Sequence, residues 1–179
     1  MYGEYREIPF SYTNTRRIRS MNYRKEILSN LVPYFRNNDK LFLIVCDMGF
    51  GVVDELKKEF PDRVINAGIM EQATVGIAAG MSMQGFVPIV YSIVNFLVYR
   101  AIEQMRNDVI LQNLNVKFIG NGVNDYFKML GESHMSGCDD IKLMEIIGMQ
   151  VYDPYKAGVD FSKLMAEWID SPKAGYIRV

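Results

Sequence analysis

The chain alternates between short apolar runs and longer mixed segments, and this alternation limits its fold more than any other feature. Six runs have the length and the β-branched content of buried strands. We expect strands at residues 41–48, 63–69, 87–94, 115–121, 150–154 and 174–179. We expect helical or amphipathic segments at residues 24–35, 51–60, 71–85, 96–113, 139–148 and 158–171.

Near-continuous apolar strands separated by helices are typical of a parallel sheet that is buried on both faces. The predicted fold class is therefore α/β, with a doubly wound, mostly parallel sheet and helices on both faces. We expect one domain over residues 22–179, because the alternation fills that range. Residues 1–21 are polar and basic without a clear period. They predict an N-terminal arm, which is either a loosely packed extension or a strap that docks on a partner.

Composition excludes several functional classes. The net charge of −1 gives no general attraction to nucleic acid or to an anionic membrane. Cys46 and Cys138 have no metal-ligand spacing, and the single histidine, His134, cannot build a multi-histidine metal site. We therefore expect reduced cysteines, no metal ligands in this chain and a cytoplasmic location. A signal peptide and a membrane-spanning run are not expected either.

In parallel sheets of this kind, ligands bind outside the carboxyl ends of the strands. Asp47 and Met48 end one predicted strand, and Glu71 follows another. Phe96 and His134 lie in segments that follow two more. Because topology alone gathers these residues, their grouping is only mild support for a site.

Each candidate has a structural as well as a functional interpretation. Glu71 is either a first-turn acid that complements a helix dipole or a carboxylate that relays a proton. Phe96 and Tyr99 are three residues apart, so they either pack in the core or offer a stacking surface to a flat ring. His134 is either an exposed loop residue or an acid–base group that faces a substrate.

Several ordered motifs resemble the pyrimidine-binding domain of transketolases and their thiamine-diphosphate relatives. The family reads Gly-Ile-x-Glu-Gln, a Gly/Ala-rich helix, Gly-Phe-x-Pro, an aromatic residue, Arg-Ala-x-(Asp/Glu)-Gln and Gly-x-(Ser/Thr)-His. This chain carries Gly68-Ile-Met-Glu71-Gln72, Gly85-Phe-Val-Pro88, Phe96, Arg100-Ala-Ile-Glu-Gln104 and Gly131-Glu-Ser-His134. The resemblance extends over residues 22–179, so the order and spacing of the motifs support it together.

The resemblance implies a role for each cofactor-facing residue. In the family, the glutamate at the Glu71 position hydrogen-bonds N1′ of the aminopyrimidine and drives the proton transfer that activates the thiazolium carbon. The aromatic residue at the Phe96 position stacks on the pyrimidine. Asp47 matches an acid at the cofactor cleft, and Met48 and Tyr99 are expected to line the same pocket.

On the substrate side, His134 matches a histidine that faces the substrate, and Arg24 is the candidate for an arginine that contacts a substrate phosphate. Met129 and Leu130 stand near the position of an acidic residue that transketolases use for a sugar hydroxyl. A second histidine is absent, and Ile93 or Val94 replaces a second cleft aromatic. These departures favour a small sugar or keto acid less polar than a standard pentose phosphate.

The family's Gly-Asp-Gly motif, which helps to hold the diphosphate and Mg²⁺, does not occur in the chain. A partner chain of the diphosphate-binding type is therefore expected to supply that half, with its metal ligands. The family's usual third domain is also missing after residue 179, either naturally or by truncation. The small residues of the 70–85 helix favour close subunit contacts, in a hetero-tetramer or a homodimer.

The predicted function is thus the pyrimidine-binding subunit of a two-chain enzyme for two-carbon transfer, of a ketol or an acyl group. Two alternatives stay open. In the first, the chain would be a catalytically silent scaffold subunit. In the second, it would be a flavodoxin-like regulatory domain that binds a metabolite.

Overall fold

The computed structural model describes residues 23–156 and 158–179, and the predicted arm at residues 1–21 lies outside them. The strands are β1 (Leu41–Val45), β2 (Val64–Asn66), β3 (Val87–Ile93), β4 (Lys117–Asn121), β5 (Gln150–Tyr152) and β6 (Gly175–Arg178). The α-helices are α2 (Tyr23–Asn37), α3 (Asp54–Glu59), α4 (Glu71–Met83), α5 (Val94–Gln104), α6 (Asp139–Ile146) and α7 (Phe161–Asp170). Shorter helical turns are η1 (Pro61–Arg63), η2 (Met105–Ile110), η3 (Lys128–Leu130) and η4 (Glu132–His134).

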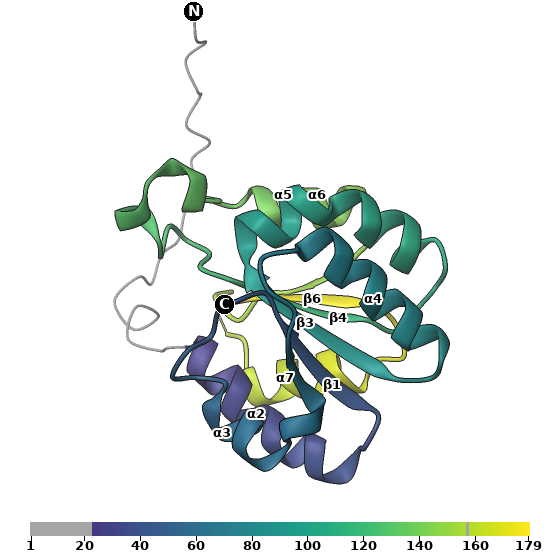
Figure 1. The fold of residues 1–179 in the computed structure, drawn as a ribbon. Helices are drawn as coiled ribbons and strands as arrows, with labels where there is room; N and C mark the ends of the chain where they lie inside the picture. The colour runs from purple at the N-terminus through teal and green to yellow at the C-terminus, as the bar shows by residue number, and fades with distance from the viewer. Residues whose placement is uncertain (1–22, 157) are drawn as a thin grey trace, which may run out of the picture.

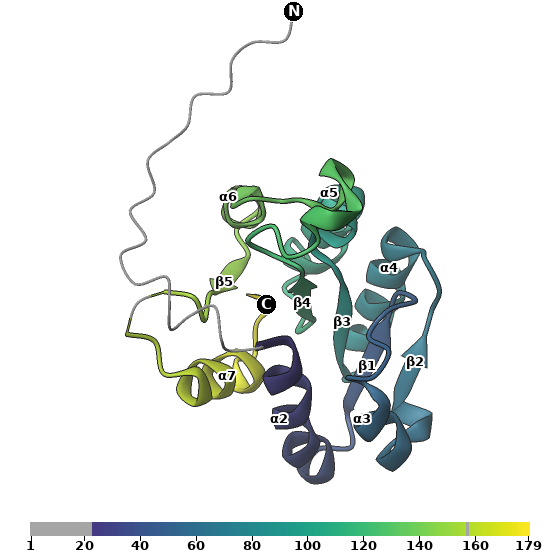
Figure 2. The same cartoon turned by 90° about the vertical axis from the view of Figure 1, so that its left-hand side faces the viewer.

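The six strands form one sheet in the order β2-β1-β3-β4-β6-β5, and every neighbouring pair is parallel. Helices α2, α3 and α7 cover one face, and α4, α5 and α6 cover the other (Figure 1). Figure 2 shows β2 and β5 as the two outermost strands of the sheet, at its opposite ends. The predicted fold class is confirmed, because the sheet is parallel throughout and helices cover both of its faces.

Two apolar clusters, one on each face, hold these layers together. Alternate side chains of a strand point to opposite faces, and β3 shows this directly. Tyr91 belongs to the cluster under α2 and α7, whereas Val90 belongs to the cluster under α4 and α5. Ser92, which follows Tyr91, therefore points to the α4 side, where it meets the start of that helix.

Element boundaries differ from the prediction at the carboxyl ends of the strands. The predicted strand at 41–48 ends at Val45, because Asp47 has a left-handed backbone with φ of 49°. The predicted helix at 96–113 begins earlier, at Val94, and its last part, Met105–Ile110, is a π-helical turn. No side chain caps the start of α5, so the sequence carries no start signal there.

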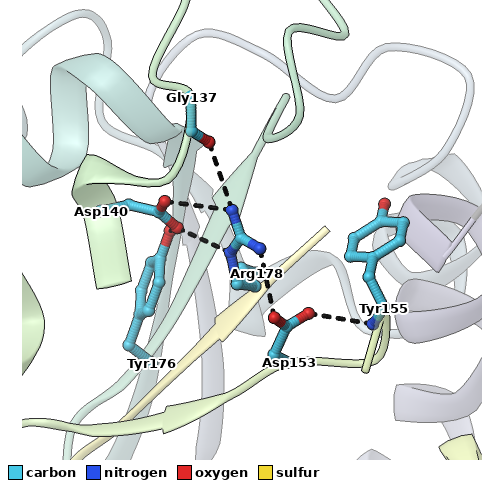
Figure 3. A network of polar contacts seen from close by, with 6 residues as sticks. All are labelled: Gly137, Asp140, Asp153, Tyr155, Tyr176 and Arg178. Carbon is cyan, nitrogen blue, oxygen red and sulfur yellow. Dashed lines mark hydrogen bonds and ion pairs between the residues drawn. The ribbon is translucent and has the colours of Figure 1, made fainter. Parts of the chain in front are cut away.

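A buried ion-pair network joins β6 to the start of α6 and the end of β5 (Figure 3). The Arg178 guanidinium is fully buried and donates to both carboxylate oxygens of Asp140, at 2.9 and 3.1 Å. It also reaches Asp153, at 3.2 Å, and the Tyr176 hydroxyl donates to Asp140 at 2.8 Å. Burial alone would lower the pKa of Arg178, but Asp140 and Asp153 outweigh it and raise that pKa.

Candidate functional site at the carboxyl edge of the sheet

Glu71 is the first residue of α4, and its side chain is only 1% exposed. The chain reaches it from β2 through Gly68, whose φ of 79° is a backbone conformation that glycine adopts without strain. The Ser92 hydroxyl donates to Glu71 Oε1 at 2.8 Å, and the Arg100 guanidinium pairs with Oε2. Both oxygens of this buried carboxylate are therefore engaged, and the helix N-terminus adds a favourable dipole.

Arg100 links Glu71 to two other predicted site residues. Its guanidinium lies over the Phe96 ring, 4.7 Å from the ring centroid. Phe96 and Arg100 are four residues apart on α5, so they share one helix face. The His134 and Phe96 rings meet edge to face, with ring centroids 5.0 Å apart and an angle of 74° between the planes. The fold thus brings Glu71, Phe96 and His134 into one contiguous group.

The Cys46 thiol borders this group from the end of β1. It is buried and donates to the Thr74 hydroxyl on α4 at 3.6 Å. Burial raises the pKa of the thiol, the Thr74 hydrogen bond opposes the rise, and the Glu71 carboxylate adds to it. Cys46 is therefore a protonated, weakly nucleophilic part of the wall.

Asp47, Met48 and Arg24 make contacts of a different kind. The exposed Asp47 carboxylate accepts a hydrogen bond from the Asn66 amide at 3.2 Å, at the ends of β1 and β2. Met48 is half-buried and packs against the cluster under α2. On that same face, burial raises the pKa of Tyr91 to about 12, and the nearby Arg24 guanidinium opposes the rise. No hydrogen bond or ion pair in the described part of the chain joins these three residues to Glu71.

Tyr99 lies on α5 beyond Phe96 and is 48% exposed. Its hydroxyl donates to the Asp139 carboxylate at 3.1 Å, across to the start of α6. The core-packing interpretation of Tyr99 is therefore wrong. Phe96 is half-buried, with one contact to a cation and one to the imidazole ring.

Sequence reasoning assigned no role to Ser92, Arg100 or Asn95, which hold the predicted residues in place. Arg100 stands in the Arg-Ala-x-Glu-Gln motif, and its spacing from Phe96 was the signal that could have identified it. Ser92 carried a weaker signal, a polar residue inside an apolar strand. Asn95 carried none, because its partners are backbone carbonyls far away along the chain.

Within residues 23–156 and 158–179, no three His, Cys, Asp or Glu side chains are grouped to hold a metal ion. None of the helices in that same part of the chain has the length and apolarity needed to cross a membrane. A cavity of about 580 Å³ lies at the amino edge of the sheet, where Val109, Gln150 and Lys173 are among its lining residues. It includes none of the predicted site residues.

The family is shown by comparison with known proteins. The model of the family described as "Transketolase, pyrimidine binding domain" matches residues 19–178. The fold, the buried glutamate at the start of α4 and this match define one class: the chain belongs to the transketolase family, as a pyrimidine-binding domain. Among the alternatives that the sequence left open, this favours the transketolase interpretation over a flavodoxin-like domain.

Particular relatives are named as transketolase subunits. An apulose-4-phosphate transketolase subunit from Phocaeicola vulgatus is 30% identical over 157 residues, 87% of this chain and 50% of that protein. The 6-deoxy-6-sulfo-D-fructose transketolase subunit SqwH from Clostridium sp. (strain MSTE9) is 31% identical over 138 residues, 76% of this chain and 41% of that protein. The chain thus spans half or less of the length of these relatives.

Solved structures agree with this placement. A structure titled "Split gene transketolase, inactive beta4 tetramer" superposes with a TM-score of 0.69 and 29% identity, over 87% of this chain and 48% of that one. Transketolase from Campylobacter jejuni superposes with a TM-score of 0.72 at 19% identity, over 86% of this chain and 24% of that one. The second likeness shows the fold alone.

Proposed function

We propose that the chain is the pyrimidine-binding subunit of a two-chain, thiamine-diphosphate-dependent transketolase-like enzyme that transfers a two-carbon ketol or acyl unit. The observation that carries this proposal is Glu71. A carboxylate that is 1% exposed is costly to bury, and here it stands at the carboxyl edge, joined through Arg100 to the half-buried ring of Phe96. A buried acid next to a flat aromatic face suits an aminopyrimidine, which needs both a proton partner and a stacking surface.

Each residue then has a definite task. Glu71 would hold and return a proton at N1′ of the pyrimidine, while Ser92 and Arg100 keep its carboxylate oriented and balance its charge. Phe96 would stack on the pyrimidine, and Asp47, Met48 and Tyr99 would line its pocket. When bound, thiamine diphosphate would supply the carbon nucleophile and the electron sink.

His134 would face the substrate, because its ring contacts Phe96 on the side of the loop between β4 and α6. Arg24 would meet a substrate phosphate from the start of α2. Exposed Met129 and Leu130 in the same loop favour a small sugar or keto acid with fewer hydroxyls to satisfy.

The diphosphate and Mg²⁺ would be held by a partner chain, since Gly-Asp-Gly is absent here and the described residues offer no acidic ligand cluster. Contacts between copies of this chain would use α4. Its outer face exposes Ile77 and Met83, and the exposed Gly76 and Gly80 lie among them. Exposed apolar side chains around small residues are suited to close helix packing.

A partner capture followed by a cofactor titration tests this function. The chain is isolated from its source with its bound partner, and the complex is titrated with thiamine diphosphate and Mg²⁺. We expect a partner that carries Gly-Asp-Gly. We also expect Glu71→Gln to lower kcat by about 10²–10⁴-fold without releasing the partner.

The matched control is Glu55→Gln, the same change at an exposed glutamate of α3. It should leave turnover as it was. Full activity of the Glu71→Gln complex would instead identify a silent scaffold. A complex that binds no thiamine diphosphate would refute the cofactor assignment.

A further inference from the structure

Asn95, in the first turn of α5, ties a distant loop to the helix that carries Phe96. Its side chain is only 8% exposed. The side-chain amide Nδ2 donates to the carbonyl oxygen of Ser133 at 3.1 Å and to that of Met135 at 2.7 Å. These two carbonyls stand on either side of His134, so one amide group holds the backbone on both sides of the imidazole.

Few other contacts hold this loop on α5. The turns η3 and η4 are short 3₁₀ segments with mostly exposed side chains. His134 itself touches Phe96 edge to face, and its Nδ1 lies 2.9 Å from the Ser133 hydroxyl. That hydroxyl belongs to the same loop, so it cannot fix the loop on the helix. The two hydrogen bonds from Asn95 are therefore the main polar link between η4 and α5 in the described part of the chain.

The chemistry of the contact requires an amide. Two carbonyl oxygens need two donors from one short side chain, and the NH₂ group of asparagine supplies both. Aspartate has the same shape, but an ionised carboxylate only accepts, so it would face two carbonyl oxygens without a donor. Asn95 Oδ1 has no hydrogen-bond partner in the described part of the chain, so the loop contact is what orients the side chain.

We propose that Asn95 is the positioning residue of His134: it fixes the imidazole relative to Phe96 and so places a substrate-facing group against the cofactor-stacking ring. The catalytic meaning of this placement rests on the proposed function. The placement itself is a property of this chain alone, and it can be measured without a partner or a cofactor.

The single histidine of the chain makes the test direct. With ¹³C-labelled histidine, the ring signals of His134 are the only ones in the spectrum. We expect Asn95→Asp to move or broaden these signals. We also expect it to speed amide exchange at His134 and Met135 by about tenfold or more, because two hydrogen bonds are lost. The matched control is Asn30→Asp, where an exposed Nδ2 donates to Glu26 O at 2.8 Å in α2, and it should change neither readout.

A second variant guards against simple misfolding. Asn95→Ser keeps one donor, so its exchange rates should fall between those of the parent and of Asn95→Asp. In each variant, the amides of β3 and β4 must keep their protection, which shows that the fold is intact. Unchanged ring signals and unchanged exchange in a folded Asn95→Asp variant would overturn the proposal.

The assembled enzyme separates this proposal from the proposed function. Asn95→Asp should lower kcat/KM for the substrate, whereas the Kd for thiamine diphosphate should stay within about twofold, because Glu71 keeps its contacts. A substrate kcat/KM equal to that of the parent would refute the positioning role. If the complex proves to bind no cofactor, the proposed function fails, while the effect on the His134 signals still decides whether Asn95 places this ring.

Discussion

Replacing Arg178 with methionine should destabilise the subunit by about 3–5 kcal/mol, the cost of removing one partner from a buried ion pair. The guanidinium is 0% exposed and makes three hydrogen bonds to two buried carboxylates, at 2.9, 3.1 and 3.2 Å. Methionine fills much of the same volume, so the loss is mainly electrostatic. Asp140 and Asp153 would then be buried without a counter-charge.

Urea denaturation measures this change. With a slope of about 2 kcal/mol per molar urea, the midpoint should fall by roughly 1.5–2.5 M. The loss of about 3–5 kcal/mol is a large part of the roughly 5–15 kcal/mol by which a folded domain is typically stable. The chain also offers a control with the same substitution: Arg36→Met removes an exposed arginine that pairs with Glu59 through two bonds, at 2.6 and 2.8 Å. Its midpoint should move far less, because water screens and replaces a surface pair.

A further variant tests the cause. If uncompensated charge is responsible, adding Asp140→Asn and Asp153→Asn to Arg178→Met should restore much of the lost stability. A midpoint shift below about 0.5 M for Arg178→Met alone would refute the reasoning, because it would mean that the two carboxylates need no buried counter-charge.

Three further predictions concern the sheet and the site. The pKa of Tyr91 is raised to about 12 in the folded state, against about 10 in the unfolded state. Above pH 10 the unfolded chain therefore loses the phenol proton while the folded chain keeps it. The free energy of unfolding is thus unaffected below pH 10 and should fall by about 3 kcal/mol between pH 10 and 12. Tyr91→Phe should therefore flatten the fall in stability over that range, measured by urea titration at each pH. Ser92→Ala should cost about 1.5–3 kcal/mol in the same assay, since the Glu71 carboxylate loses a 2.8 Å hydrogen bond; no loss would mean that water replaces the hydroxyl. Gly122→Ala should lower the melting temperature by several degrees, because φ is +91° and a Cβ would stand 2.2 Å from the Phe127 ring, and an unchanged melting curve would contradict this.

The sequence predicted the layers of the fold well, because strand alternation and helix periodicity are local patterns. It also predicted Glu71 at the start of a helix. It did not predict where each strand ends. Val45 and Cys46 are both apolar, but β1 ends at Val45, and the left-handed backbone at Asp47 then begins the loop. Patterns of hydrophobicity do not report a single backbone angle.

The polar contacts of the site could not be predicted from the sequence, for a different reason. Glu71 and Arg100 are 29 residues apart, and Asn95 and Met135 are 40 apart. Such pairs are set by how parallel strands bring their ends to one edge, so they become visible only when the sheet order is known. Chemistry-bearing residues can be nominated from motifs, but the side chains that orient them mostly cannot.

The order of the strands also bears on how the chain folds during synthesis. β6 lies between β4 and β5, although it is the last of the six strands along the chain. Until it leaves the ribosome, β5 has no neighbour and the β4 edge is open. Arg178, on the same strand, is also the counter-charge for two carboxylates that were made earlier. From the synthesis of Asp153 until Arg178 follows it 25 residues later, the nascent chain therefore carries an open β4 edge and two unmatched acids, which is an interval of about 1–5 seconds at roughly 5–20 residues per second.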